Sequence, residues 1–420
     1  MNPPTDTLGP GGTRIFAANL AVSWAVLDGP AGGTIDATGT YTAPTAPGIY
    51  RVVAISTANA SNSATATVTV VQSGFTFTGS MAKGRLQHTA TLLPNGKVLI
   101  LGGSDGRDIA DGLYPVSEAE LFDPTTGTFV SAGDTQRSFD TATLLLNGTV
   151  LVTGGDTGST TTQTAELYDP TSGLFQPTGS METPREGPSA TLLADGKVLL
   201  TGGIRPLDPL GLSWETLQTA EVYDPATGTF SPTGNMVNPR TSHTATLLPD
   251  GTVLLTGGTV LDSGSNAAGQ SAELYDAVTR SFTPTGSMAV PREGHTATLL
   301  LNGKVLVVGG FTDAPGATAE LYDPSTRLFS PAGRMTTARG AHTATLLPNG
   351  TVLIAGGYPH TSTAELYDPI TASFTLTGGM GGARFSHTAT MLRDGRVLVT
   401  GGVTSGDGPL TVLNTAEIYK

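Results

Sequence analysis

A short hydrophobic stretch that ends in two glycines recurs along most of the chain. It reads GKVLILGG at 96–103 and returns as GTVLVTGG (148–155), GKVLLTGG (196–203), GTVLLTGG (251–258), GKVLVVGG (303–310), GTVLIAGG (350–357) and GRVLVTGG (395–402). Consecutive apolar or small residues are typical of a β-strand that is buried on both faces, and the glycines give the backbone freedom where the strand ends. The copies start 45 to 55 residues apart, which predicts a repeated β unit.

Each copy belongs to a unit of four predicted strands, A to D. In one unit, strand A is HTATLL (243–248), strand B is GTVLLTGG (251–258), strand C is AELYD (272–276) and strand D lies in SFTPTG (281–286). The A–B connections contain Asn-Gly or Asp-Gly, which favours tight type I′ hairpins. Four short strands that repeat about every 50 residues indicate the blades of a β-propeller.

The two ends of the chain differ from this repeat. Residues 1–72 contain alternating runs such as VSWAVLD (22–28) and GIYRVVAIS (48–56), which predict a small β-sandwich. The seventh unit stops at AEIYK (416–420) without a strand D, whereas FTFTG (75–79) has the form of a strand D that lacks A, B and C. We therefore expect domains at 1–72 and 73–420, with the last blade closed by residues 75–79.

Both domains resemble known families. The glycine pairs, the Tyr of strand C and the aromatic residue of strand D resemble the kelch repeat over residues 75–420, with Phe where that family usually has Trp. The N-terminal runs resemble bacterial Ig-like domains; whether this domain is truncated at its N-terminus stays open. The resemblances imply an all-β fold, a seven-bladed kelch-type β-propeller with a small N-terminal Ig-like β-sandwich.

The composition of the chain argues against several classes of partner and chemistry. The net charge is −13 and cysteine is absent, which argues against a nucleic-acid partner and excludes disulfides and thiolate chemistry. No apolar run is long enough to insert into a membrane. A Thr- and Gly-rich, Lys-poor acidic chain suits the outside of a bacterial cell, although no signal peptide is visible. We expect a monomer that is secreted or held at the cell surface.

The B–C connections vary in length between the repeats, and the A–B and C–D turns on the opposite face are short and uniform. Because rigid scaffolds usually carry function on variable loops, the B–C loop face is the predicted binding face. One arginine per repeat enters strand A at this face. It predicts either a cationic ring for an acidic ligand or ion pairs between blades with the Glu of strand C. These arginines are Arg85, Arg137, Arg185, Arg240, Arg292, Arg339 and Arg384.

Two aromatic residues on B–C loops are further candidates for ligand contacts. Trp214 lies in the longest loop, 204–219, and either packs on the neighbouring blade or stacks on a sugar or peptide; Tyr114 is the second candidate. Five histidines share one repeat position, three residues after the arginine. We interpret them as packed, hydrogen-bonded residues rather than as a metal site.

The kelch resemblance includes copper oxidases of the galactose oxidase type. Their activity requires a Tyr–Cys crosslink, which a chain without cysteine cannot form. No acid–base pair stands outside the repeat pattern, so we expect no catalytic residues, cofactor or metal. The sequence therefore predicts a non-catalytic propeller that binds a glycan or protein ligand on the B–C loop face. The alternatives are a structural or adhesin module of a longer surface protein and a carbohydrate-active, isomerase-like enzyme.

Overall fold

The computed structural model describes residues 4–8, 13–44, 46, 48–70, 74–106, 115–135, 137–158, 160–208, 213–262, 265–311, 316–404 and 410–420. The chain divides into two compact units, Met1–Phe75 with Lys420, and Thr76–Tyr419. Within the described residues, no helix has the length and apolar character needed to cross a membrane.

The first unit contains two sheets around one core. One sheet has the order β1 (Thr5–Leu8), β7 (Ser63–Val70), β6 (Gly48–Ser56), β3 (Val22–Val26), and the other has the order β2 (Thr13–Ile15), β5 (Thr40–Thr42), β4 (Thr34–Ile35); a 3-10 turn, η1, spans Gly29–Gly32. Strand β1 pairs with β7 in parallel. Tyr41 of β5 and Val52 of β6 are fully buried in the shared core, and Trp24 packs against it half-buried. Alternating apolar residues thus join the facing sheets.

The second unit is built from four-stranded sheets in which neighbouring strands run antiparallel. In chain order the sheets are β9 (Thr89–Leu92), β10 (Val98–Leu101), β11 (Glu118–Asp123), β12 (Thr128–Asp134); β13 (Thr141–Leu144), β14 (Val150–Thr153), β15 (Ala165–Asp169), β16 (Leu174–Pro177); β17 (Ser189–Leu192), β18 (Val198–Thr201), β21 (Ala220–Asp224), β22 (Thr229–Pro232); β23 (Thr244–Leu247), β24 (Val253–Thr256), β27 (Ala272–Asp276), β28 (Ser281–Pro284); β29 (Thr296–Leu299), β30 (Val305–Val308), β31 (Thr318–Asp323), β32 (Leu328–Arg334); β33 (Thr343–Leu346), β34 (Val352–Ala355), β35 (Ala364–Asp368), β36 (Ser373–Thr377); and β37 (Thr388–Met391), β38 (Val397–Thr400), β41 (Ala416–Tyr419), β8 (Phe75–Phe77).

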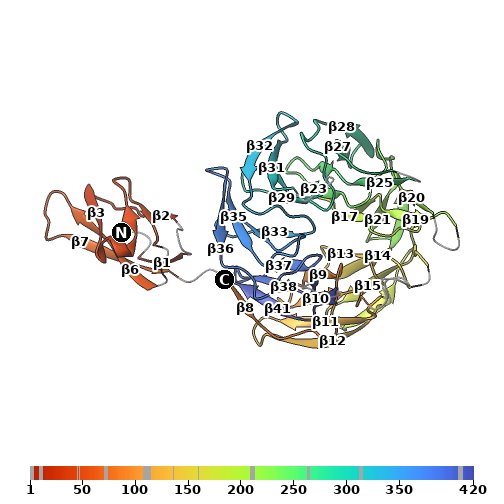
Figure 1. The fold of residues 1–420 in the computed structure, drawn as a ribbon, viewed down its shortest axis with the longest axis horizontal. Helices are drawn as coiled ribbons and strands as arrows, with labels where there is room; N and C mark the ends of the chain where they lie inside the picture. Colours follow the sequence, from red (N-terminus) through yellow and green to blue (C-terminus); the bar gives the residue numbers. More distant parts are fainter. Residues whose placement is uncertain are drawn as a thin grey trace. The chain divides into compact units, whose positions relative to one another are not determined.

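The first strands of these sheets make a closed ring. Strands β9, β13, β17, β23, β29, β33 and β37 contact one another in that order, and β37 contacts β9. Figure 1 shows these strands near the centre, with the later strands of each sheet farther out. The arrangement is that of an all-β fold of many small antiparallel sheets, consistent with a β-propeller.

Strand β8 is the outer strand of the sheet that contains the chain's last strand. It follows β41 in the order β37-β38-β41-β8. The Thr78 backbone N–H donates to the Ala416 carbonyl at 3.0 Å. Because β8 covers one side of β41, that strand has no open edge in this sheet.

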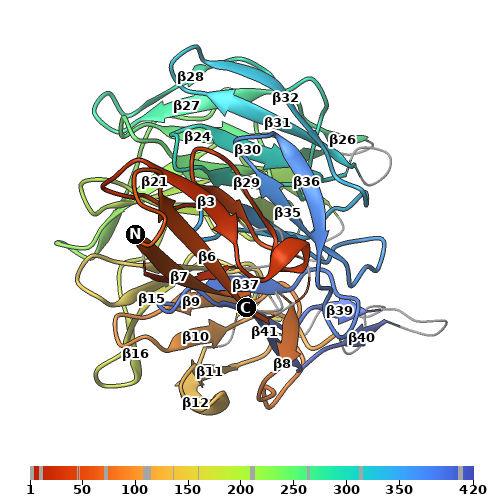
Figure 2. The same cartoon turned by 90° about the vertical axis from the view of Figure 1, so that its left-hand side faces the viewer.

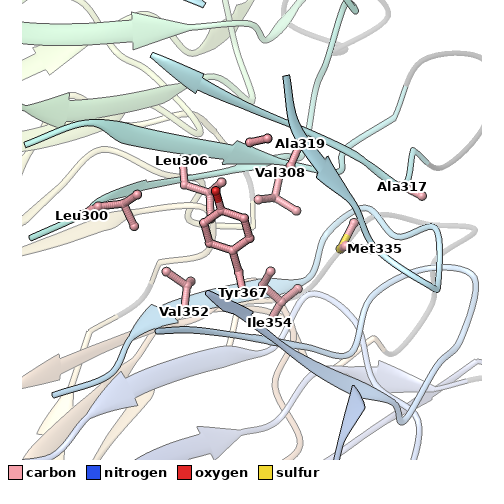
Figure 3. Close-up of a cluster of buried hydrophobic side chains, with 10 residues drawn as sticks. Leu300, Leu306, Val308, Ala317, Ala319, Met335, Val352, Ile354 and Tyr367 are labelled. Atoms are coloured by element: carbon pink, nitrogen blue, oxygen red, sulfur yellow. The ribbon is translucent and has the colours of Figure 1, made fainter. Parts of the chain in front are cut away.

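Apolar side chains from neighbouring sheets fill the space between them. In the cluster of Figure 3, Tyr367 of β35 lies among Leu306 and Val308 of β30 and Val352 and Ile354 of β34, all fully buried. The tyrosine at this repeat position also packs on the phenylalanine of the next strand, with ring centroids 4.7–4.9 Å apart in five repeats. This packing explains why the spacing of Tyr and Phe is the same in each of these repeats.

Among the described residues, three B–C connections contain small hairpins of their own. They are β19 (Ile204–Pro206) with β20 (Trp214–Thr216), β25 (Thr259–Asp262) with β26 (Ser265–Ala268), and β39 (Val403–Thr404) with β40 (Thr411–Val412). Figure 2 shows β26 and the β39–β40 hairpin extending from the same face of the second unit. The variable connections therefore emerge together, as expected for strands that alternate in direction.

Candidate functional site

The seven arginines are buried within the sheets. The Arg339 guanidinium donates to the carbonyls of Gly356 and Thr363 at 2.7 and 2.9 Å and to Glu365 Oε1 at 2.8 Å. Arg339 and Glu365 both have an exposed fraction of 0%, and burial lowers the pKa of Arg339 against the opposing effect of Glu365. Corresponding ion pairs of 2.6–3.3 Å join Arg85–Glu120, Arg137–Glu166, Arg185–Glu221, Arg240–Glu273, Arg292–Glu320 and Arg384–Glu417.

Each of these pairs joins an arginine and a glutamate of the same repeat, rather than neighbouring blades. The second oxygen of Glu365 accepts a hydrogen bond from the Thr336 backbone N–H at 2.7 Å, in the connection that enters the repeat. The guanidinium groups therefore hold the ends of strands together and face carbonyls and carboxylates. This geometry favours a structural role, and a ligand-binding role for the arginines stays a prediction.

The repeated histidines are also buried. His342 Nε2 lies 3.0 Å from the Thr296 hydroxyl, and His387 Nε2 lies 3.1 Å from the Thr343 hydroxyl of the preceding sheet. Burial lowers the pKa of His342 to about 3, with a smaller effect of Arg339, so the ring is neutral near pH 7. Among the described residues, no group of three His, Cys, Asp or Glu side chains could hold a metal ion.

The structure describes only one of the two aromatic candidates. Tyr114 lies outside the described residues. Trp214 is half-buried in β20, opposite Pro206, and its neighbour Glu215 pairs with Arg205 at 2.7 Å. The Arg185 guanidinium of the same repeat donates to the Thr219 carbonyl and to Glu221. A ligand contact by Trp214 stays a prediction.

A ring of backbone contacts encircles the axis at the B–C loop face. In each repeat the residue after the arginine forms an isolated antiparallel bridge with the residue after the glycine pair. The bridges are Leu86–Ser104, Ser138–Asp156, Glu186–Ile204, Thr241–Thr259, Glu293–Phe311, Gly340–Tyr358 and Phe385–Val403. We call these fourteen residues the bridge ring.

The next residue in each repeat adopts the left-handed conformation and links neighbouring repeats. For example, Ala341 has φ 49° and Ser386 has φ 52°. The Ala341 N–H donates to the Gly294 carbonyl at 2.9 Å, and the Ser386 N–H donates to the Ala341 carbonyl at 3.0 Å. These hydrogen bonds run from sheet to sheet, which fixes the bridge ring around the common axis.

The charged side chains of the bridge ring are all acidic. They are Asp156, Glu186 and Glu293, and none of the other bridge residues is ionisable except Tyr358. Burial raises the pKa of Glu186 to about 7, with a further contribution from the negative charge of Asp156. Burial also raises the pKa of Glu293, against a hydrogen bond from Thr259 that lowers it. Both glutamates are half-buried, and carboxyls whose pKa is raised toward neutrality are suited to proton transfer.

Aromatic side chains occupy the adjacent part of the ring, and we call them the aromatic arc: Phe311, Tyr358, His360 and Phe385. The ring centroids of Phe311 and Tyr358 are 6.0 Å apart, and those of Tyr358 and Phe385 are 5.7 Å apart. His360 lies 5.1 Å from both Tyr358 and Phe385. Tyr358 nevertheless keeps 40% of its surface exposed, so the arc combines ring packing with solvent access.

Sequence reasoning missed the bridge ring. Its positions lie directly after the repeated arginine and the glycine pair, and their residue types differ from repeat to repeat. The signal that could have found them is this variation inside an otherwise regular motif. Two of the positions are glutamates, Glu186 and Glu293, although neither belongs to the set that pairs with the arginines.

Comparisons with known proteins show the class of fold. No protein-family model and no curated protein matches the chain. The structure is similar to that of a fungal alcohol oxidase of the AA5 family solved in complex with copper, with a TM-score of 0.64 and 19% sequence identity, over 83% of this chain and 76% of that chain. At this identity the likeness shows the fold, an all-β protein of the β-propeller type.

The comparison corrects the predicted function. One protein of similar structure is an oxidase, which contradicts the predicted non-catalytic binding function, and we withdraw that function with its structural and isomerase-like alternatives. Among the residues that the structure describes, however, the side chains do not fit a copper centre. Cysteine is absent, and the repeated histidines are hydrogen-bonded inside the sheets. His360 packs against Tyr358 in the aromatic arc, and among the described residues it belongs to no group of three possible metal ligands.

Proposed function

We propose that the chain is an enzyme that hydrolyses a C–O bond in a hydroxyl-bearing substrate at the bridge ring, with Glu186 and Glu293 transferring the protons. We further propose that the second unit is a seven-bladed kelch-type propeller, that the first unit is an Ig-like domain, and that the protein acts outside the cell as a monomer. The substrate would enter from the face with the B–C loops.

The observation that carries the proposal is the position of the two carboxyl groups. Glu186 and Glu293 belong to the same ring of bridges, remain half-buried, and are absent from the ion pairs found among the described residues. Glu186 stays largely protonated up to about neutral pH because burial raises its pKa. It can therefore donate a proton to a leaving oxygen, while the Glu293 carboxylate takes a proton from the attacking water.

Substrate chemistry is suggested by the aromatic arc. Aromatic rings beside a few polar groups are typical of small-molecule sites and stack on the apolar faces of sugar-like rings. The similar structure belongs to an enzyme named for alcohols, which are also hydroxyl-bearing compounds. This analogy supports the substrate class and does not extend to the copper-dependent reaction.

The test is turnover by protein treated with a chelator. A panel of oligosaccharides and aryl glycosides is incubated with the wild type, and products are followed by mass spectrometry. We expect cleavage that survives chelation and falls about 100-fold in Glu186→Gln and in Glu293→Gln. Glu182→Gln is the matched control, because Glu182 is an exposed glutamate in the same repeat as Glu186. Equal turnover in all four proteins would contradict the assignment.

A further inference from the structure

We propose that the bridge ring recognises a positively charged, amine-bearing sugar, whose ring packs on the aromatic arc and whose ammonium group faces Glu293. This inference rests on the proposed function for the site, and it names the class of substrate. The proposed ligand is therefore cationic, whereas the repeated arginines suggested an acidic ligand in the sequence.

The charge around the axis favours a cationic ligand. The arginines that enter each repeat are neutralised by buried glutamates, as in the pairs Arg185–Glu221 and Arg292–Glu320 at 2.9 and 3.0 Å. The bridge ring itself contains three carboxyl groups and no Lys, Arg or His. A ligand with a carboxylate or phosphate would therefore meet like charge, whereas an ammonium group would meet opposite charge.

One carboxyl group of the bridge ring adjoins the aromatic arc. Glu293 and Phe311 are directly opposite each other in an antiparallel bridge, so their side chains project to the same side. Phe311 also lies over two glycines, since an added Cβ would be 3.1 Å from its ring at Gly294 and 2.5 Å at Gly340. The missing side chains leave room for the aromatic ring at the end of the arc that adjoins Glu293.

The rings of the aromatic arc suit both a cation and the apolar face of a sugar. A cation near the face of a tyrosine or phenylalanine is attracted by the negative face of the ring, and the apolar face of a sugar can stack on the same rings. Tyr358 is the most exposed member of the arc, at 40%. An amino sugar combines both features, because it has hydroxyl groups, a ring with an apolar face and an ammonium group.

The experiment compares two tetrasaccharides that differ in one substituent per ring. A β-1,4-linked glucosamine tetramer carries amines where cellotetraose carries hydroxyl groups, and both are titrated calorimetrically into the full chain near pH 6.5. We expect the amine-bearing tetramer to bind at least tenfold tighter. We expect Glu293→Gln to remove most of this preference and Tyr358→Leu to weaken binding of the glucosamine tetramer roughly fivefold to thirtyfold. Glu182→Gln should leave the preference unchanged.

The outcomes separate this inference from the proposed function. Equal affinity for the two tetramers, or tighter binding of cellotetraose, overturns the inference, even if hydrolysis of neutral glycosides is found. Preferential binding of the glucosamine tetramer without any hydrolysis supports the inference and contradicts the enzymatic function. Unfolding of a variant is detected by its melting curve, and Phe385→Leu then provides a second test of the arc.

Discussion

Gly340 and Phe311 fit each other across two neighbouring repeats: a Cβ added to Gly340 would lie 2.5 Å from Cε2 of Phe311. Gly340 does not need left-handed backbone freedom, because it is absent from the glycines with positive φ. The glycine is therefore required by the aromatic ring beside it rather than by its own backbone.

Gly340→Ala should displace Phe311 and lower the free energy of unfolding by about 1–3 kcal/mol, as overpacking does elsewhere. The second substitution Phe311→Leu should restore stability but not binding or turnover at the bridge ring. Gly382→Ala is the control, because an added Cβ there meets no atom within 4 Å. Equal melting temperatures for Gly340→Ala and Gly382→Ala would show that the ring and the glycine are not coupled.

Arg339→Ala should destabilise the protein strongly, because it leaves the buried Glu365 carboxylate without its partner. Loss of one member of a buried pair costs about 3–5 kcal/mol, whereas Arg334→Ala on the exposed end of β32 should change the free energy of unfolding by less than about 0.5 kcal/mol. Denaturant unfolding measures both. If Arg339→Ala instead keeps full stability and loses only ligand binding, the arginine ring is a ligand site after all.

Asp140 stands where five repeats have histidine, and it should make the fold less stable as the pH rises. Neither of its carboxyl oxygens has a hydrogen-bond partner on another described residue, and burial raises its pKa from 3.8 to about 7. A folded-state pKa above the unfolded value means that the folded protein binds the proton more tightly. The stabilisation that the protonated Asp140 carboxyl contributes is therefore complete below about pH 4 and is lost as the pH rises to 7.

Asp140→Asn should accordingly increase stability relative to the wild type more at pH 8 than at pH 4. The pKa difference sets an upper limit of about 4 kcal/mol for the change in this gain. Melting curves of both proteins over this pH range provide the measurement. A gain that is the same at both pH values would mean that Asp140 does not titrate between them.

Removal of residues 1–80 should expose the edge of β41 and cause a lower melting temperature or aggregation, because β8 is the neighbour of β41 in that sheet. Removal of residues 1–70 leaves β8 in place and should keep the second unit folded. Melting and light scattering of the two shortened proteins test this. Identical behaviour of both would show that β8 contributes nothing to closure.

Much of the fold follows from the repeat. The second strand of each unit is fully buried, as the apolar run Val98–Leu101 indicates, and residues 75–79, predicted as the closing strand, include β8 at Phe75–Phe77. The repeated arginine and glutamate are recognisable as possible partners because their numbers match, although their pairing within one repeat depends on how the connection folds back over the sheet.

The candidate site was not predictable in the same way. Glu186 and Phe385 occupy equivalent positions in different repeats, so no motif joins them in the sequence. Their proximity to the axis results from isolated bridges and from left-handed residues such as Ser386, which is neither Gly nor Asn. Backbone conformations of this kind are set by contacts between neighbouring sheets and leave little trace in local residue preference.

The central claim is that Glu186 donates a proton at the bridge ring, and the pH dependence of kcat/KM for chelator-treated enzyme tests it most directly. Because a general acid must be protonated and the pKa of Glu186 is raised to about 7, the wild-type rate should fall as the pH rises through that value. Glu186→Gln should be about 100-fold slower and should lack this decline, while Glu182→Gln should retain it. A Glu186→Gln profile that matches the wild type in rate and shape would contradict the account.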